Sequence, residues 1–203
     1  MLNAEFWVLG AMEGIRSFIA IEVPQPLQAR MGELQRELKR VEADVKWVRP
    51  GSIHFTLKFL GTVPEEVLEK FSLAISPVIS SWEPFDLRIH GLGCFPSSRN
   101  PRILWLGIDR GTEQISPLQE VIEKKAVEVS LLPEPRPFTP HLTIGRVRSF
   151  KGKGALTQAI EAHKNIEIGA FQAKEVFLFQ SELTPSGAIY TKLKTFPMRA
   201  NHV

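Results

Sequence analysis

Cysteine is almost absent from this sequence, since Cys94 is the only one among 203 residues. A single cysteine cannot form an intramolecular disulfide or a cysteine-based metal cluster, which excludes the disulfide-stapled class of small secreted proteins. This usage fits a reducing compartment, and we therefore expect a cytoplasmic protein. Cys94 itself is interpreted as a small buried residue and not as a nucleophile.

Long hydrophobic runs are also missing. No stretch holds the roughly 20 apolar residues that a membrane-spanning helix needs, and the apolar patch near the N-terminus lacks a basic region and is interrupted by Glu5. The sequence therefore predicts neither a membrane protein nor a signal peptide. Met12 is a second plausible start, so residues 1–11 are interpreted as a disordered extension or a start-site artefact. Residues 12–203 have the length of one domain.

The sequence carries no large excess of charge of one sign and no nucleotide-cofactor motif. Its formal net charge is +3 with a pI near 9.1, which is compatible with an anionic substrate but does not establish one. The glycine-containing stretches 91–93 and 152–154 lack the spacing of Walker or dinucleotide-binding loops. We expect no cofactor.

Hydrophobic periodicity and turn residues divide the chain into short elements. Amphipathic spacing predicts helices over 26–43, 64–80, 114–129 and 155–163. Alternating or β-rich runs predict strands over 15–23, 45–48, 52–61, 85–95, 102–109, 141–147, 171–183 and 188–197. Many of these strands follow one another through short turns, which favours antiparallel or mixed pairing and an α+β class over a doubly wound parallel sheet.

One four-residue word occurs twice, as His54-Phe55-Thr56-Leu57 and as His141-Leu142-Thr143-Ile144. With this composition, roughly 0.04 copies of such a word are expected by chance. Side chains alternate along a strand, so each word places a histidine and a threonine on one face and apolar residues on the other. The repetition indicates two similar lobes, each contributing one strand to a shared site.

The two histidines and two threonines are compatible with several kinds of chemistry. Taken alone, either word is a half-buried strand with an incidental histidine. A metal site has only two candidate ligands and no carboxylate at a matching spacing, and a hydrolase triad lacks a nucleophile motif. Two imidazoles that face each other suit displacement at phosphorus, in which one accepts a proton and the other donates one. The threonine hydroxyls would then donate hydrogen bonds to phosphate oxygens.

The two words and their surroundings resemble the 2H phosphoesterase superfamily, and in particular the RNA 2′,3′-cyclic phosphodiesterases, also called 2′-5′ RNA ligases. The resemblance covers residues 16–196 and rests on the stretches RSFIAIEVP, VKWVRPGSIHFTLKFLG, RILWLGI, RPFTPHLTIGR and SELTPSGAIYTKL. It implies a bilobal single domain in which two antiparallel sheets, related by a pseudo-two-fold axis, line a central cleft with the helices outside.

The resemblance also implies roles for individual residues. His54 would be the proton donor and His141 the proton acceptor, an assignment that the two nearly symmetric words cannot make by themselves. Thr56 and Thr143 would hold the phosphate together with Arg146, the arginine five positions after the second histidine. Simple strand alternation points Arg146 away from His141, and a bulge or a strand end is needed to re-aim it.

Two further residues are candidates for a phosphate or RNA site. Lys58 shares the predicted face of His54 and Thr56, and either adds positive potential there or is a solvated lysine at a strand end. Phe138 precedes the second word, and either stacks on a terminal base or anchors its loop in the core. The tryptophans Trp47 and Trp105 are expected in the core.

The expected function is hydrolysis of RNA 2′,3′-cyclic phosphodiester ends to 2′-phosphomonoesters without a metal ion, with 2′-5′ ligation as a related activity. The expected partners are RNA ends or nucleotides with a 2′,3′-cyclic phosphate, and no membrane or obligate protein partner; a monomer is expected. Two alternatives remain open. One is a related enzyme that acts on another cyclic phosphate or a 2′-5′ oligonucleotide, and the other is a weakly active module that binds RNA ends.

Overall fold

The computed structural model describes residues 14–185 and 187–199, so the predicted extension over 1–11 lies outside the described residues. The elements, in chain order, are β1 (Ile15–Glu22), α1 (Gln25–Lys39), β2 (Val45–Trp47), the short 3-10 helix η1 (Pro50–Ser52), β3 (His54–Val63), α2 (Glu65–Ser81), β4 (Phe85–Ser97), β5 (Asn100–Arg110), α3 (Thr112–Glu128), β6 (Leu142–Val147), α4 (Lys153–Ala162), β7 (Glu167–Ala173), β8 (Glu175–Thr184) and β9 (Gly187–Pro197).

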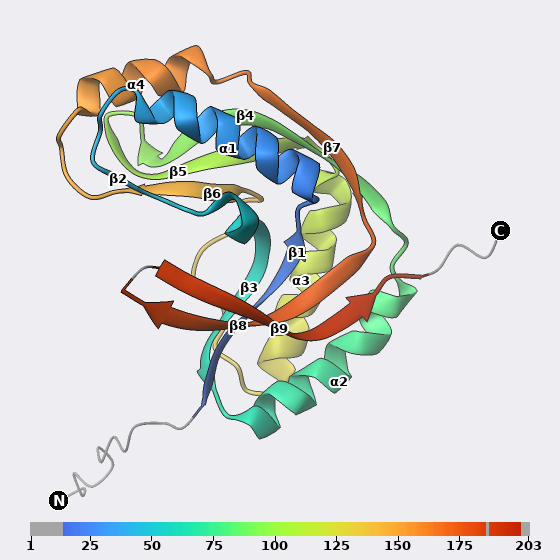
Figure 1. Ribbon diagram of the computed structural model, residues 1–203. Helices are drawn as coiled ribbons and strands as arrows, with labels where there is room; N and C mark the ends of the chain where they lie inside the picture. Colours follow the sequence, from blue (N-terminus) through green and yellow to red (C-terminus); the bar gives the residue numbers. More distant parts are fainter. Residues whose placement is uncertain (1–13, 186, 200–203) are drawn as a thin grey trace, which may run out of the picture.

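All strand pairs in the described residues are antiparallel, which confirms the predicted α+β class. The strand order is β7-β4-β5-β6-β3-β1-β8-β9, with β2 added beside β6. We predicted two sheets, and the structure joins them into one curled sheet through the single pair Phe55 and Leu142 (Figure 1). One half of the sheet is thus β7-β4-β5-β6-β2, and the other is β3-β1-β8-β9.

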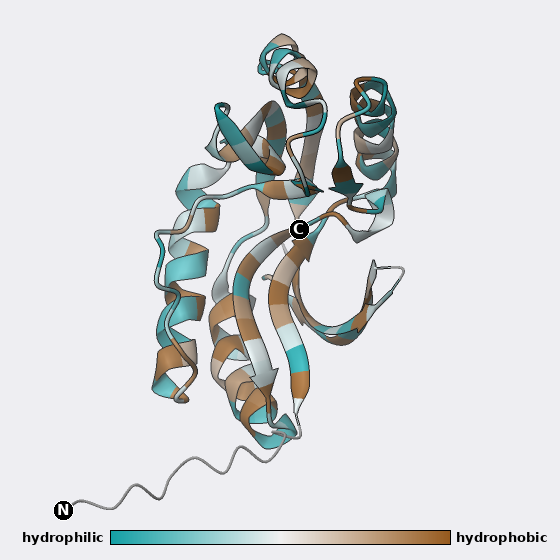
Figure 2. Ribbon diagram, turned by 90° about the vertical axis from the view of Figure 1, so that its left-hand side faces the viewer, coloured by the Kyte–Doolittle hydropathy of each residue, from teal (hydrophilic) through white to brown (hydrophobic). Residues whose placement is uncertain are grey.

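The four α-helices cover the outer side of the sheet, two for each half (Figure 1). Helices α1 and α4 contact β7 and β4 in one half, while α2 and α3 contact β9 and β3 in the other. Their apolar residues recur at helical spacing, and hydrophobic and hydrophilic stretches accordingly alternate along them (Figure 2). Burial of these stripes against the sheet forms the main core, which includes Met31, Phe71, Leu104, Leu142 and Ile144.

The opposite face of the sheet, which we call the open face, has a composition of its own. A second, smaller cluster of Phe18, Ala20, Phe177 and Phe179 lies there, packed against Tyr190 and separate from the main core. The sheet therefore buries its helix-covered face as expected, and places aromatic side chains on a face that carries no helix.

Two predicted elements differ from the structure. The helix predicted over 26–43 ends at Lys39, because the chain turns there and Glu42 adopts a left-handed backbone with φ of 51°. The strand predicted over 171–183 is two strands, since β7 begins earlier, at Glu167, and pairs with β4, whereas β8 pairs with β1. The chain thus crosses from one half of the sheet to the other at Lys174.

A β-bulge interrupts each of the two histidine strands at the fourth residue of the repeated word. In β3, Thr56 pairs with Ala20 and Lys58 with Ile19, so Leu57 is the extra residue. Beyond a bulge the alternation of side chains is reversed, because two consecutive residues point to the same face. Leu57 and Lys58 are both buried on the helix-covered side, and Phe59 returns to the open face.

Strand β6 repeats this irregularity against β5. Thr143 pairs with Trp105 and Gly145 with Leu104, which leaves Ile144 as the extra residue. Ile144 and Gly145 are both buried, as Leu57 and Lys58 are in β3. The following residue, Arg146, returns to the open face.

Candidate active site

The pair that joins the two halves of the sheet also brings the two repeated words together. Phe55 and Leu142 lie opposite each other in antiparallel register. One residue to either side, this register places His54 across from Thr143 and Thr56 across from His141. Diagonal neighbours in such a pair are about 7–8 Å apart, and the two histidines stand in that relation or further apart where the strands diverge.

Both imidazoles are oriented by the same local hydrogen bond. Nδ1 of His54 lies 2.9 Å from the carbonyl oxygen of Ser52, and Nδ1 of His141 lies 2.7 Å from that of Thr139. In each case Nδ1–H donates to a carbonyl two residues upstream, which fixes the tautomer and leaves Nε2 as the reactive nitrogen. Within the described residues neither Nε2 nor the hydroxyls of Thr56 and Thr143 have a hydrogen-bond partner.

His54 is enclosed by aromatic rings of the second cluster. Phe18 stacks on it with ring centroids 4.6 Å apart, and Tyr190 meets it edge to face at 5.2 Å. This desolvation lowers the pKa of His54 to about 4, although the Ser52 carbonyl and the charge of Glu22 oppose the effect. His54 is therefore neutral near pH 7 in the free protein.

His141 lies in a different environment on the other half of the sheet. Phe95 contacts it edge to face at 5.1 Å, and Phe95 in turn packs against Trp105 at 5.2 Å. Trp105 was expected in the core; instead it lies on the open face opposite Thr143, with its indole over Gly93. A Cβ atom on Gly93 would lie 2.3 Å from that ring, so only glycine leaves room for it.

The bulge at Ile144 decides the orientation of Arg146. Arg146 pairs with Ile103, which stands two residues from Trp105 on the same face of β5, so Arg146 shares the open face with Thr143. Simple alternation predicted the opposite, and a bulge was the feature required to overcome it. Arg146 therefore projects from the same face of the sheet as the histidines and threonines of the two repeated words.

Tyr190 packs against Phe18 and His54 in its own half and lies within electrostatic range of Arg146 in the other half. Burial raises the pKa of its phenol, while the charges of Arg146 and Arg16 lower it. Arg146 belongs to β6 and Tyr190 to β9 at the far edge of the other half, so the open faces of the two halves turn toward each other. The sequence held no signal for Tyr190 beyond its place in a strand.

The prediction for Lys58 is wrong. The bulge at Leu57 turns its side chain away from His54 and into the protein, where only 1% of it is exposed. There Nζ donates to Glu123 Oε2 at 2.9 Å and to the carbonyl oxygen of Leu132 at 3.0 Å. Lys58 therefore adds no positive potential on the open face.

Phe138 follows the loop-anchoring alternative. Its ring is half-buried and packs against the main core instead of standing free beside His141. The loop that leads into the second word is thus tied down by an apolar contact.

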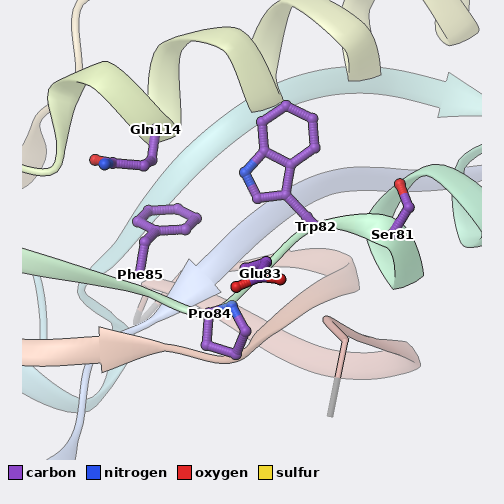
Figure 3. A pocket seen from close by; sticks show the side chains of 6 residues that line it. All are labelled: Ser81, Trp82, Glu83, Pro84, Phe85 and Gln114. Carbon is purple, nitrogen blue, oxygen red and sulfur yellow. The ribbon is translucent and has the colours of Figure 1, made fainter. Parts of the chain in front are cut away.

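A separate hollow of about 490 Å³ lies on the outer side of the protein, at the end of α2 (Figure 3). Trp82, Phe85 and Gln114 surround it, and its one ionisable side chain, Glu83, pairs with Arg199 at 3.3 Å. It contains none of the repeated-word residues. In the part of the chain that the structure describes, no three potential metal ligands cluster, and no helix is long and apolar enough to cross a membrane.

Comparison with known proteins gives consistent similarities. The family described as LigT like Phosphoesterase matches residues 21–105 and again 106–190, one repeated word in each match. A Methanothermobacter thermautotrophicus protein named RNA 2′,3′-cyclic phosphodiesterase is 37% identical over 90% of this chain and 98% of its own. One of the same name from Methanocaldococcus jannaschii is 33% identical over 89% and 99%.

Solved structures show the same architecture. The crystal structure of TT0787 of Thermus thermophilus is 27% identical and superposes with a TM-score of 0.75, over 93% of this chain and all of that one. A crystal structure of Escherichia coli LigT complexed with 3′-AMP, 25% identical, also gives 0.75, over 92% and 99%.

Proposed function

The chain belongs to the LigT-like phosphoesterases, a family of enzymes, and from this premise we propose that it opens the 2′,3′-cyclic phosphate at an RNA end and leaves a 2′-phosphate. Relatives that bear the name RNA 2′,3′-cyclic phosphodiesterase and match nearly the whole chain support this substrate class.

One observation carries the proposal. Two histidines, each with Nδ1 bound to a carbonyl and Nε2 free, flank a single strand pair on the open face, and each lies across from the other word's threonine. Hydrogen bonds of about 2.7–3.0 Å on either side leave room for one phosphate between the imidazoles. The arrangement suits an in-line attack at phosphorus with a proton moved at each end.

We assign the roles as follows. His141 Nε2 takes a proton from water as its oxygen attacks phosphorus, and the P–O3′ bond breaks. Protonated His54 gives its Nε2 proton to the departing O3′, while the P–O2′ bond is kept. Thr56, Thr143 and Arg146 donate hydrogen bonds to the non-bridging oxygens, where negative charge accumulates. The scheme uses only side chains of this protein and needs no cofactor.

His54 must carry a proton in order to act as the acid, and its pKa of about 4 in the free protein works against this. A cyclic phosphate bears a negative charge, and an adjacent anion favours the imidazolium. Substrate binding therefore raises the pKa of His54 and supplies the protonated acid where it is used.

The same geometry accounts for a ligase activity. A 5′-hydroxyl that takes the place of water attacks the same phosphorus, and the 2′-oxygen that stays attached becomes part of a 2′-5′ linkage. We expect this reaction to be slow whenever water has free access to the open face.

The test is incubation with 2′,3′-cyclic nucleotides in the presence of EDTA, followed by identification of the phosphomonoester. We expect the 2′-phosphate, and kcat values about 10²–10⁴ lower for His54→Ala and His141→Ala. The double variant loses much less than the product of the two effects, because the pair acts as a unit. EDTA sensitivity, or a 3′-phosphate product, would contradict the scheme.

Two rival functions are separated by the same assay. Faster turnover of a cyclic phosphate on ADP-ribose, or of a 2′-5′ oligonucleotide, would identify a related enzyme with another substrate. Equal hydrolysis by the wild type and His54→Ala would indicate a module that binds RNA ends.

A further inference from the structure

Cations continue along the open face and past the end of β6, beyond the residues assigned to the phosphate. We define the outer strip as one aromatic and four basic residues, namely Lys46, Arg102, Arg148, Phe150 and Lys153. Lys46, Arg102, Arg148 and Phe150 are exposed and Lys153 is partly exposed, and none of the five was assigned to the site above.

The strip begins directly beside Arg146. Lys46 of β2 pairs with Arg146 of β6, and opposite residues of an antiparallel pair project from the same face. Arg148 follows two residues after Arg146, about 6.5–7 Å further along the chain. Three cations thus continue outward from the position proposed for the scissile phosphate.

The strip ends on an exposed aromatic ring. Phe150, in the loop between β6 and α4, is 64% exposed. Arg102 lies 5.5 Å from its ring centroid and Lys153 lies 4.9 Å from it, so two cations lie within cation–π distance of the ring. A large apolar side chain on the surface, kept in place by positive charges, is a platform on which a base can stack.

The charge of the strip is not neutralised by the protein. Within residues 14–185 and 187–199, no ion pair or side-chain hydrogen bond links any of its four cations to a carboxylate. Some other exposed cations do pair with carboxylates, for example Lys70 with Glu66, Arg88 with Asp109 and Lys192 with Glu22. Asp44 meets Arg148 only through its backbone carbonyl.

We propose that the outer strip binds the single-stranded RNA that precedes the cyclic end, so that the enzyme holds several nucleotides and not only the last one. The inference rests on the proposed function. A 2′,3′-cyclic phosphate closes the 3′ end of a chain, so the rest of the RNA leaves through the 5′ oxygen of the terminal ribose. Lys46 and Arg148 contact the next phosphates, and Phe150 stacks on a base.

The test compares two substrates with one triple variant, Lys46→Ala/Arg148→Ala/Phe150→Ala. The substrates are 2′,3′-cyclic AMP and a ten-nucleotide single-stranded RNA that ends in a 2′,3′-cyclic phosphate. We expect the ratio of kcat/KM on the RNA to kcat/KM on cyclic AMP to fall at least about tenfold. Each lost phosphate contact also lowers the slope of log kcat/KM against log salt by about 0.7 for the RNA.

The matched control is Leu73→Ala/Lys124→Ala, which removes an equally exposed apolar side chain and a cation from the outer helices. It should leave the ratio unchanged. An unchanged ratio in the strip variant would overturn the proposal, as would an equal fall in the control.

Binding of the same RNA, labelled with a fluorophore and followed by anisotropy, separates this inference from the proposed function. If the wild type hydrolyses neither substrate, the proposed function fails. The strip then stands if the wild type binds the RNA at least about tenfold more tightly than the triple variant, and falls if both bind alike.

Discussion

His54 and His141 carry the same backbone hydrogen bond and differ in what surrounds them. Three aromatic rings, Phe18, Phe179 and Tyr190, contact His54, whereas among the described residues one aromatic ring, Phe95, contacts His141. A symmetric pair of side chains thus becomes chemically unequal through its neighbours. In the free protein this inequality leaves His54 neutral near pH 7, so its proposed role as the acid depends on the charge that a bound phosphate brings.

The burial of His54 predicts a pH dependence of stability. Its pKa is near 6.5 in an unfolded chain and about 4 in the folded protein, so between these values the unfolded state binds the extra proton. As far as His54 is concerned, the free energy of unfolding keeps its full value above pH 6.5. It falls by roughly 3 kcal/mol as the pH decreases from 6.5 to 4. Urea unfolding from pH 4 to 7 measures it.

The control for this prediction is His54→Asn, which keeps a polar side chain and cannot titrate. Its unfolding free energy should vary less over the same range, by the amount assigned to His54. Parallel curves for the two proteins would show that His54 is not desolvated in solution.

Much of the site could be predicted from residue types, and its missing parts have a common cause. The repeated word identified the two histidines and two threonines as one group, and the structure places all four on one face. Trp105 and Tyr190 lie beside them without any local signal. An aromatic residue in a strand reads as core until strand pairing shows which face it occupies.

At the scale of elements, the bulges at Leu57 and Ile144 determine which side chains reach the open face. Alternation alone placed Lys58 with His54 and removed Arg146 from His141, and both outcomes are reversed. A single inserted residue reverses the faces of the residues that follow it, until a second register shift such as the one at Leu60 restores them. Because a bulge depends on pairing with another strand, the sequence of β3 or β6 alone could not reveal it.

Substitution of Gly93 in β4 tests the packing of Trp105, which lies on the neighbouring strand β5. In Gly93→Ala the new methyl group overlaps the Trp105 indole and displaces it from Phe95, the ring that contacts His141. We expect a loss of about 1–3 kcal/mol in unfolding free energy and a lower kcat/KM on 2′,3′-cyclic AMP. Thermal unfolding and the hydrolysis assay measure the two effects.

Gly154→Ala is the matched control, because a Cβ atom at that position in α4 meets nothing within 4 Å. It should stabilise the helix slightly and leave activity unchanged. Equal behaviour of the two variants would mean that the Trp105 ring moves freely.

In the whole molecule, the two segments that match the family, residues 21–105 and 106–190, are interleaved, and we call them the first and second repeat. The first repeat supplies α1, β2 and β4 to one half of the sheet, but β3 and α2 to the other; the second supplies α3, β8 and β9 to the half that holds β3. Each half of the sheet is therefore built from strands of both repeats. Hydrophobic periodicity predicted most elements, but it could not predict that each half contains strands of both repeats. The crossing at Lys174 lies inside the single strand predicted over 171–183.

Lys58 of the first repeat and Glu123 of the second form a salt bridge in which the lysine is buried. We expect this salt bridge to stabilise the fold. Glu123 Oε1 also accepts a hydrogen bond from the backbone N–H of Glu134, in the loop toward the second word. Glu123→Ala leaves the Lys58 ammonium buried without its counterion, and we expect a loss of about 3–5 kcal/mol in unfolding free energy. Urea denaturation measures it.

The double variant Lys58→Met/Glu123→Leu should recover a large part of this loss, since it removes the buried charge altogether. Glu66→Ala, which breaks the exposed pair with Lys70, should leave the urea midpoint almost unchanged. A loss after Glu123→Ala as small as that of Glu66→Ala would contradict the stabilising role of the Lys58–Glu123 salt bridge.

The paired bulges also bear on the direction in which a substrate lies. The histidines and threonines alone do not distinguish between two opposite substrate orientations. A rotation of 180° about the Phe55–Leu142 pair exchanges the two words, so a phosphodiester could bind in either direction. The equivalent positions beyond the bulges are Phe59 and Arg146, an aromatic ring and a guanidinium. These two unlike side chains distinguish the two orientations, so that, under the proposed function, the substrate strand has one preferred direction in the site.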